Sequence, residues 1–560
     1  MPLELSYVTG DKQVALIEES IGVYFDGVAA RYPEREALVV VHQNIRWSYR
    51  QFKEKVEALA GNLLEAGLCP GDRVGIWAQN CSEWVLTQFA TAKLGLILVT
   101  INPAYRRSEL EYALKKAQCR ALILAPRFKT SDYLAILQSV VPDLATAVPG
   151  ALNLSLLPEL KIVVRMGVEP TPGMLNFDRL LDAPSAAALQ RMAAIQASVR
   201  CDDPVNIQFT SGTTGAPKGA TLTHRNILNN GFFVGEAMRL TAADKLCIPV
   251  PLYHCFGMVL GNLACVTHGA AMVYPGEGFD PKAVLEAVQQ ERCSGLHGVP
   301  TMFIAVLEHP EFARYDLSSL RTGIMAGSPC PVEVMRRVLD DMSMREVTIA
   351  YGMTETSPVS FQSSVDDPIE LRVSTVGRIH PHVEVKIIDA AGETVARGEK
   401  GELLTRGYSV MSRYWNDPEK TKEAIDEAGW MHTEDIAVID ANGYCKIVGR
   451  AKDMVIRGGE NIYPREVEEF LYTHPKVQDV QCVGLPDEKY GEELCACIIL
   501  KPGMTADAEE IKAYCRNEIA HYKVPRYIRF VDSFPMTVTG KVQKYLLRNS
   551  VASELGLKHD

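Results

Sequence analysis

One stretch of the chain combines glycines, hydroxyl side chains and a single lysine, a composition suited to holding phosphate. It spans residues 210–219 and follows an apolar run at 205–209. Glycines let backbone N–H groups approach phosphate oxygens, the hydroxyls add donors, and Lys218 adds a positive charge. The stretch predicts a polyphosphate-binding loop made by Thr210, Ser211, Gly212, Thr213, Thr214, Gly215, Ala216, Pro217 and Lys218.

This loop differs from the Walker phosphate loop. The Walker pattern requires a second glycine five residues after the first, and Pro217 stands five residues after Gly212. A kinase or GTPase of that type is therefore disfavoured. A flexible glycine–threonine turn between a strand and a helix is the structural alternative, and the loop alone leaves it open.

Further polar motifs follow apolar runs that read as strands. Residues 251–257 include His254, residues 326–329 include Gly327, and residues 351–356 include Glu355. Ligands of open α/β sheets bind outside the carboxyl ends of the strands. We therefore expect these segments and the phosphate loop to meet in one crevice.

The elements that position these motifs follow from hydrophobic spacing. Helical patterns at 49–67, 83–94 and 108–117 alternate with apolar runs at 74–77, 96–99 and 121–124. This alternation predicts an α/β sheet with crossover helices. Residues 134–200 contain several prolines and predict a long surface connection with short helices.

The texture changes after residue 378. Alternating apolar and polar residues with turns such as Asn442-Gly443 predict an antiparallel, barrel-like subdomain. A smaller core begins after residue 453. The predicted fold class is α/β, with a large N-terminal domain (1–448), a hinge (449–453) and a smaller, mobile α+β C-terminal domain (454–560).

Composition limits the classes of function. The chain has 560 residues, 47% hydrophobic and 23% charged, with a net charge of -11. This acidic balance argues against a nucleic-acid surface. The 14 cysteines include no C-x-x-C pair, which favours free thiols in a reducing compartment. With no signal peptide or transmembrane segment apparent, we expect a cytoplasmic protein; a homodimer stays open.

Taken together, TSGTTGAPKG, YGMTET, HTED, GRAKD and the terminal TGK resemble the adenylate-forming superfamily. That superfamily comprises acyl-CoA synthetases, firefly luciferases and peptide-synthetase adenylation domains. The motifs occur in its order over residues 25–548. The run at 457–464 is most similar to medium- and long-chain fatty acyl-CoA synthetases.

The resemblance implies a two-step reaction in one crevice. A carboxylic acid and ATP give an acyl-adenylate and pyrophosphate, and the thiol of coenzyme A then displaces AMP. The implied partners and cofactors are a small-molecule carboxylic acid, ATP, Mg²⁺ and coenzyme A. Because the substrate carboxylate is the nucleophile, the protein must align it and stabilise charge on the phosphoryl oxygens.

The same resemblance implies roles for the phosphate-side residues. Lys218 and its loop would hold the β and γ phosphates. Glu355 and Thr210 would bind Mg²⁺, with Thr354 as a further oxygen donor.

The nucleotide's sugar and base are assigned by the same motif match. Asp435 and Arg450 would hold the ribose hydroxyls. Tyr351 with Gly327 and Ser328 would line the adenine, and Gly352 is a further candidate for nucleotide binding.

The terminal domain would contribute the catalytic Lys541, which would reach the α-phosphate and the attacking carboxylate. His254 would act as a gate between the acyl tunnel and the adenylate site, and an ordinary core histidine is the alternative. Lys452 matches the hinge residue, and rotation there would bring a coenzyme A segment to the site. That segment contains Gly458, Gly459 and Glu460.

Two positions depart from the superfamily pattern, since Glu434 and Arg413 stand where glycine is usual. The predicted function is an AMP-forming fatty acyl-CoA synthetase. Two alternatives stay open: an enzyme that loads an acyl or aryl acid onto a carrier protein, and a non-catalytic acyl-binding protein.

Overall fold

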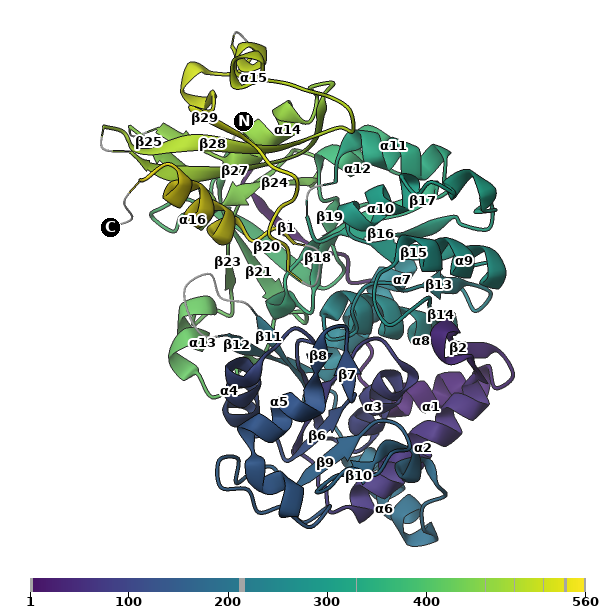
Figure 1. Ribbon diagram of the computed structural model, residues 1–560. Helices are drawn as coiled ribbons and strands as arrows, with labels where there is room; N and C mark the ends of the chain where they lie inside the picture. The colour runs from purple at the N-terminus through teal and green to yellow at the C-terminus, as the bar shows by residue number, and fades with distance from the viewer. Residues whose placement is uncertain are drawn as a thin grey trace.

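The computed structural model describes residues 4–210, 217–328, 330–458, 460–487, 489–516, 518–537 and 541–557 (Figure 1). Within these ranges the strands form an eight-stranded sheet, a nine-stranded sheet, two five-stranded sheets and a small hairpin. The hairpin consists of β7 (Arg127–Phe128) and β8 (Ser131–Asp132).

The eight-stranded sheet contains the first strands that the sequence predicts. Its order is β10-β9-β6-β4-β5-β11-β12-β22, and its pairs are parallel from β10 to β11. The predicted α/β alternation is confirmed. The strands are β4 (Arg73–Trp77), β5 (Ile97–Thr100), β6 (Ala121–Leu124), β9 (Ile162–Arg165), β10 (Leu175–Asn176), β11 (Pro204–Thr210), β12 (Lys218–Thr223) and β22 (Arg413–Tyr414).

Helices between these strands begin where capping residues allow. In α2 (Tyr49–Glu65), the Ser48 side chain accepts from the backbone N–H of Gln51, and the Gln51 side chain reciprocates. Phe52, Val56 and Leu59 are fully buried along one side of α2, as the helical spacing predicts. The neighbouring helices are α1 (Ile21–Arg31), α3 (Ser82–Lys93), α4 (Arg107–Ala117), α5 (Tyr133–Val140) and α6 (Ala186–Ser198).

The prediction of a surface connection over residues 134–200 is wrong in part. Strand β9 lies inside the eight-stranded sheet, and Ile162, Val163 and Val164 are buried. The 13-residue helix α6 follows it. The flanking prolines obscured a strand of only four residues, which pairs with β10 and with the more distant β6.

The nine-stranded sheet forms the second half of the large domain. Its order is β19-β18-β17-β16-β15-β13-β14-β2-β3, and the pairs from β17 to β2 are parallel. Its strands are β2 (Glu36–Val40), β3 (Ile45–Ser48), β13 (Lys245–Cys247), β14 (Ala271–Tyr274), β15 (Gly295–Gly298), β16 (Thr322–Ala326), β17 (Glu346–Gly352), β18 (Val359–Gln362) and β19 (Arg378–Ile379). Its helices are α7 (His224–Ala237), α8 (Ala264–His268), α9 (Pro281–Glu291), α10 (Pro300–Leu307), α11 (Val332–Asp340) and α12 (Ile369–Ser374).

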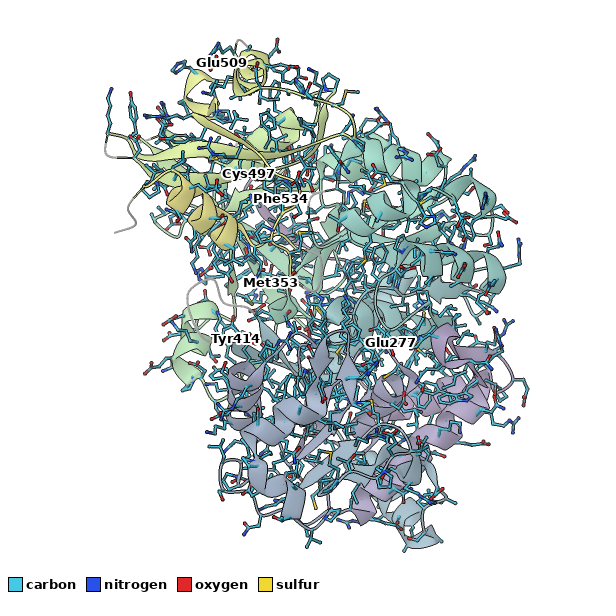
Figure 2. All side chains as sticks on the ribbon, in the orientation of Figure 1. Glu277, Met353, Tyr414, Cys497, Glu509 and Phe534 are labelled. Carbon is cyan, nitrogen blue, oxygen red and sulfur yellow. The ribbon has the colours of Figure 1, made fainter. Side chains whose placement is uncertain are left out.

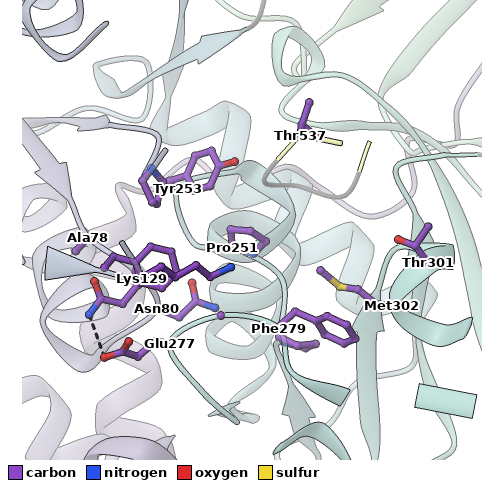
Figure 3. Close-up of a pocket in the computed structure, with 15 residues that line it drawn as sticks. Ala78, Asn80, Lys129, Pro251, Tyr253, Glu277, Phe279, Thr301, Met302 and Thr537 are labelled. Carbon is purple, nitrogen blue, oxygen red and sulfur yellow. Dashed lines mark hydrogen bonds between the residues drawn. The ribbon is translucent and has the colours of Figure 1, made fainter. Parts of the chain in front are cut away.

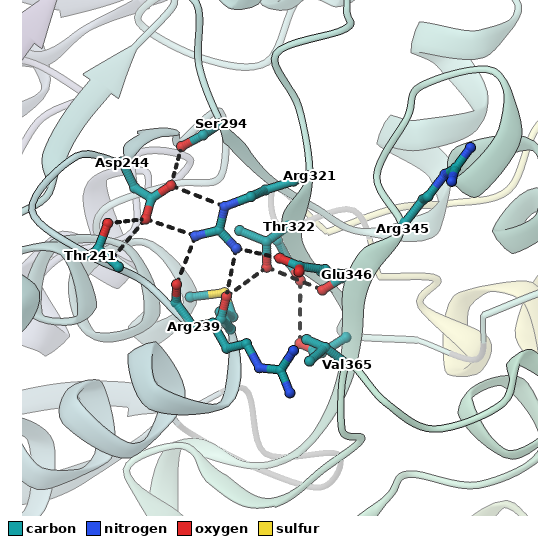
Figure 4. Close-up of polar contacts among 12 residues, drawn as sticks. Arg239, Thr241, Asp244, Ser294, Arg321, Thr322, Arg345, Glu346 and Val365 are labelled. Carbon is teal, nitrogen blue, oxygen red and sulfur yellow. Dashed lines mark hydrogen bonds and ion pairs between the residues drawn. The ribbon is translucent and has the colours of Figure 1, made fainter.

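A charged cluster joins the amino-terminal ends of these parallel strands (Figure 4). Arg321 precedes β16 and pairs with Asp244, which precedes β13, at 2.7 Å. It also pairs with Glu346 at the start of β17. Asp244 accepts from the hydroxyl of Ser294, which precedes β15, at 2.7 Å. The cluster holds the amino-terminal ends of these strands together. The polar motifs follow the opposite, carboxyl-terminal ends.

The third sheet is the predicted antiparallel subdomain. It consists of β1 (Tyr7–Thr9), β20 (Val383–Ile388), β21 (Gly401–Gly407), β23 (Met431–Ile439) and β24 (Cys445–Arg450), in that order. Every pairing is antiparallel. Helix α13 (Pro418–Ala424) lies before β23.

The last sheet belongs to a separate hydrophobic core. Its strands are β25 (Val455–Arg457), β26 (Glu460–Ile462), β27 (Val477–Asp487), β28 (Gly491–Leu500) and β29 (Tyr527–Phe530), with α14 (Pro464–Leu471), α15 (Ala508–Cys515) and α16 (Lys544–Glu554). The short helix η7 (Ala451–Asp453) connects β24 to β25. The domain boundary at 449–453 stays a prediction, and this connection lies at that position.

Candidate active site

The phosphate-loop motif lies at the end of a β-hairpin. Strands β11 and β12 are antiparallel, and Thr210 is the register partner of Lys218. The Thr210 hydroxyl donates to the Lys218 carbonyl at 3.4 Å, and the Pro217 carbonyl accepts from the Tyr112 hydroxyl at 2.9 Å. The predicted residues Ser211, Gly212, Thr213, Thr214, Gly215 and Ala216 lie outside the described residues.

Glu355 lies close to this hairpin. It is in the short helix η6 (Thr354–Thr356), is 8% exposed, and its backbone carbonyl accepts from the Met411 N–H at 2.8 Å. Its Oε1 accepts from the Tyr414 hydroxyl at 2.8 Å. The Lys218 ammonium lies 4.4 Å from the centre of the Tyr414 ring. One tyrosine thus contacts both the loop lysine and the candidate metal ligand.

A second polar group connects the antiparallel five-stranded sheet, which contains β23 and β24, to the nine-stranded sheet, which contains β17. Asp435 on β23 is the register partner of Arg450 on β24, and the Arg450 Nε lies 3.3 Å from the Asp435 Oδ1. The Tyr351 hydroxyl, from the end of β17, donates to the Asp435 Oδ2. Burial raises the pKa of Asp435, whereas Arg450 and Tyr351 act against this shift. The two residues predicted for the ribose thus lie against Tyr351, which was predicted for the adenine, and these roles stay predictions.

Lys541 of the last domain enters the same crevice. A methyl group on Gly327, whose φ is +93°, would lie 3.8 Å from the Lys541 Cε. Part of the Lys541 side chain is accessible to solvent, yet its surroundings desolvate the ammonium and lower its pKa, with Arg450 acting in the same direction. The carboxylates of Asp435 and Glu355 oppose this shift. Both domains thus contribute to one site.

His254 borders this lysine and is uncharged. Its Nδ1 accepts from the Phe256 N–H at 3.1 Å. Burial, and next the charge of Lys541, lower the pKa of His254 to about 3. The neighbouring Cys255 Sγ lies 4.0 Å from the Thr354 hydroxyl. The function of His254 as a gate stays a prediction.

The glycines of the two strand-end motifs permit close backbone approach. A methyl group on Gly352 would lie 1.7 Å from the Pro358 carbonyl oxygen, so only glycine fits there. Gly327 has a left-handed backbone. Ser328 follows it with an exposed side chain.

A cavity of about 310 Å³ is lined in part by the segments that precede His254 and Lys541 (Figure 3). Its lining includes Tyr253, the neighbour of His254, and Thr537, whose hydroxyl accepts from the Lys541 N–H at 3.0 Å. Asn80, between β4 and α3, and Met302 of α10 also line the cavity. This cavity offers space for part of a small substrate beside Tyr253 and Thr537.

The predicted coenzyme A segment lies elsewhere in this arrangement. Gly458, with φ +60°, forms the turn between β25 and β26, and Glu460 is exposed on β26. This hairpin packs against β28 of its own domain. Lys452 on η7 pairs with Glu434 at 2.8 Å. Gly459 lies outside the described residues.

Mg²⁺ fits the donors in the crevice, since this ion is commonly held by one or two carboxylates together with substrate phosphates. Glu355 supplies a nearly buried carboxylate, and Thr210 and Thr354 supply hydroxyls. No group of three or more His, Cys, Asp or Glu side chains suited to a metal occurs in the described ranges.

Sequence reasoning missed Tyr414. Its hydroxyl contacts a residue 59 positions away in the sequence, so no local motif reveals the pair. Figure 2 labels Tyr414 and also Met353, which precedes η6.

The fold and the crevice define an α/β enzyme in which a terminal domain inserts a lysine among charged groups of a large domain. The chain belongs to the AMP-binding enzyme family, because that family matches residues 25–415 and the AMP-binding enzyme C-terminal domain matches residues 466–541. The resemblance to adenylate-forming enzymes is confirmed.

Named relatives are similar over nearly the whole chain. "Medium-chain acyl-CoA ligase ACSF2, mitochondrial" of Danio rerio is 49% identical, covering 99% of this chain and 92% of the relative. "Putative acyl-CoA synthetase YngI" of Bacillus subtilis is 50% identical, covering 97% and 99%. The solved anthranilate CoA ligase AuaEII, in complex with anthranoyl-AMP, has a TM-score of 0.85 at 27% identity, covering 98% and 99%.

One further expectation concerns membranes. Across the described ranges, every helix is too short or too polar to serve as a membrane span.

Proposed function

We propose that this protein is an AMP-forming acyl-CoA synthetase that activates medium-chain fatty acids with ATP and transfers the acyl group to coenzyme A. The observation that carries the proposal is the position of Lys541, which extends from the last domain toward Glu355, Asp435 and Arg450. The names of the relatives support both the reaction and the medium chain length.

The first step joins the acid to AMP. A carboxylate oxygen of the acid attacks the α-phosphorus of ATP, and pyrophosphate leaves. Lys541 stabilises the negative charge that develops between the carboxylate and the phosphoryl group, and Lys218 holds the departing phosphates. Asp435 accepts from the ribose hydroxyls, and Arg450 opposes the rise in the pKa of this carboxyl group that burial causes. Mg²⁺, when bound by Glu355 with Thr210, would offset phosphate charge.

The second step transfers the acyl group. The thiol of coenzyme A attacks the acyl carbonyl carbon, and AMP leaves. Lys452 lies in the connection η7, where rotation of the last domain would withdraw Lys541 and present Gly458 and Glu460. His254 is neutral, so it can hydrogen-bond a substrate without adding a charge.

Two alternatives make different predictions. An enzyme that loads a carrier protein would form the adenylate but would not consume free coenzyme A. A non-catalytic acyl-binding protein would release no pyrophosphate. Cytoplasmic location and a homodimer stay predictions, and the name of the zebrafish relative places that protein in mitochondria.

The test measures pyrophosphate release with octanoate and ATP, followed by consumption of free coenzyme A. We expect both in the natural protein. In the Lys541→Ala variant we expect pyrophosphate release to fall at least 100-fold, since a preorganised charge in such a site supplies about that factor. Lys501→Ala, which removes an exposed lysine of the same domain, serves as the matched control and should retain full activity.

The acid preference needs a panel of straight-chain acids from C2 to C18 and aryl acids. Maximal kcat/KM near C8 would support the medium-chain assignment, and a maximum with an aryl acid would contradict it. Pyrophosphate release that is absent in the natural protein, or undiminished in Lys541→Ala, would reject the proposed mechanism.

A further inference from the structure

Tyr414 has a position that the surrounding backbone fixes. It is 3% exposed and pairs with Ala220 across the β12–β22 ladder. Its N–H donates to the Thr421 hydroxyl at 3.0 Å, and the next residue, Trp415, donates its N–H to the Gly219 carbonyl at 2.7 Å. These contacts hold the ring without help from Lys218 or Glu355.

The ladder register explains why Lys218 lies over this ring. Side chains two residues apart on a strand share one face, so Lys218 and Ala220 lie on the same face of β12. Because Ala220 is opposite Tyr414, Lys218 is its diagonal neighbour, a distance that long side chains span. The ammonium is 4.4 Å from the ring centre, within range of a cation–π interaction.

The edge of the same tyrosine engages an anion. Its hydroxyl donates to the Glu355 Oε1 at 2.8 Å. Donation fixes the rotamer of a nearly buried carboxylate, and it leaves Lys218 and Glu355 connected through one rigid ring.

We propose that Tyr414 is a positioning residue for adenylation: its hydroxyl orients Glu355 toward the cation bound with ATP, and its ring holds Lys218 in place to meet the phosphates of ATP. This inference rests on the proposed function. The two contacts come from different parts of the side chain, so substitutions can remove them separately.

The first variant is Tyr414→Phe, which removes the hydroxyl and keeps the ring. We expect the Mg²⁺ concentration for half-maximal pyrophosphate release to rise about tenfold, a typical effect of losing a hydrogen bond to a charged group. The KM for ATP at saturating Mg²⁺ should change less than twofold, because Lys218 keeps its ring contact. Tyr414→Leu removes both contacts, and we expect both quantities to rise about fivefold or more.

Tyr444→Phe is the matched control. The Tyr444 hydroxyl also donates to a carboxylate, the Oδ1 of Asp367, at 2.6 Å, away from the crevice. The same chemical change there should leave the Mg²⁺ requirement and the KM for ATP unaltered. Thermal unfolding of all three variants reports any loss of folded protein.

Calorimetric binding of ATP, with and without Mg²⁺, gives a readout that does not need turnover. We expect Tyr414→Phe to weaken the Mg²⁺-dependent part of ATP binding and to spare the Mg²⁺-independent part. Absent pyrophosphate release by the natural protein would reject the proposed function, while the binding data would still decide the role of Tyr414. An unchanged Mg²⁺ dependence in Tyr414→Phe, or a fall in kcat alone, would overturn the positioning role.

Discussion

Several buried histidines of the large domain are held in the neutral form. Burial lowers the pKa of His224 and His380 to about 3 and that of His297 to about 4. In the unfolded chain such groups titrate near 6.5. The unfolded state therefore binds protons that the folded state does not, and stability is lost as the pH falls below 6.5 toward the folded pKa values.

We predict that His380→Gln makes stability less dependent on pH. Each neutral buried histidine lowers the free energy of unfolding by about 1 kcal/mol between pH 6.5 and 5.5. Removing one such histidine should reduce, by that amount, the change in the free energy of unfolding between about pH 6.5 and 5.5, whatever the variant's absolute stability. Urea unfolding at both values measures it. An identical pH difference in the variant and the natural protein would show that His380 is not held neutral.

For single residues, the sequence points most directly to those that lie in a distinctive motif. Glu355, Asp435, Arg450 and Lys541 were predicted to meet, and they lie around one crevice, although their roles remain predictions. The contacts among them could not be derived, because they arise from strand register, as for Asp435 and Arg450. Tyr414 was missed for the same reason.

At the scale of elements, the sequence predicted alternating helices and strands but not every partner. The phosphate loop looked like a strand followed by a loop, and the structure adds β12 as an antiparallel return strand before α7. Strand β9 was not predicted, because four residues are too few to show a clear pattern of alternating apolar and polar side chains. Short strands are defined by their neighbours in the sheet more than by their own residues.

Strand β23 contains Glu434, which stands where the family usually has glycine. The backbone conformation there explains why glycine is usual. Glu434 has φ +59°, a left-handed conformation that suits glycine better than glutamate. Its carboxylate pairs with Lys452 at 2.8 Å, between β23 and the connection η7. The exposed pair partly offsets a backbone cost of about 1 kcal/mol.

We therefore predict an order of stability for two substitutions at this position. Both Glu434→Gly and Glu434→Gln remove the ion pair, but only glycine relieves the left-handed backbone. Glu434→Gly should be more stable than Glu434→Gln by about 1 kcal/mol in urea unfolding. Equal stability, or a more stable glutamine variant, would mean that the left-handed backbone carries no strain.

At the scale of the whole molecule, exposed ion pairs join the two domains while Lys541 occupies the crevice. The Lys400 ammonium lies 2.8 Å from the Glu466 Oε1 across the interface, and Lys446 lies 3.7 Å from Glu469. Lys523 of the last domain also binds Glu466, at 2.5 Å. Glu466 thus has one lysine partner in each domain. Substituting the two lysines separately distinguishes the ion pair between domains from the ion pair within the last domain.

The final prediction uses this symmetry. Lys400→Met removes an ion pair between domains, and Lys523→Met removes one within the last domain from the same carboxylate. Exposed pairs contribute about 0.2–1 kcal/mol, so losing Lys400 should shift the domain equilibrium by up to about fivefold. In single-turnover measurements, Lys400→Met should slow adenylate formation by up to that factor and leave transfer from preformed adenylate to coenzyme A unchanged or faster. Lys523→Met should change neither the rate of adenylate formation nor the rate of transfer to coenzyme A. If both variants slowed both steps equally, the Lys400–Glu466 pair would stabilise the protein without favouring one domain arrangement.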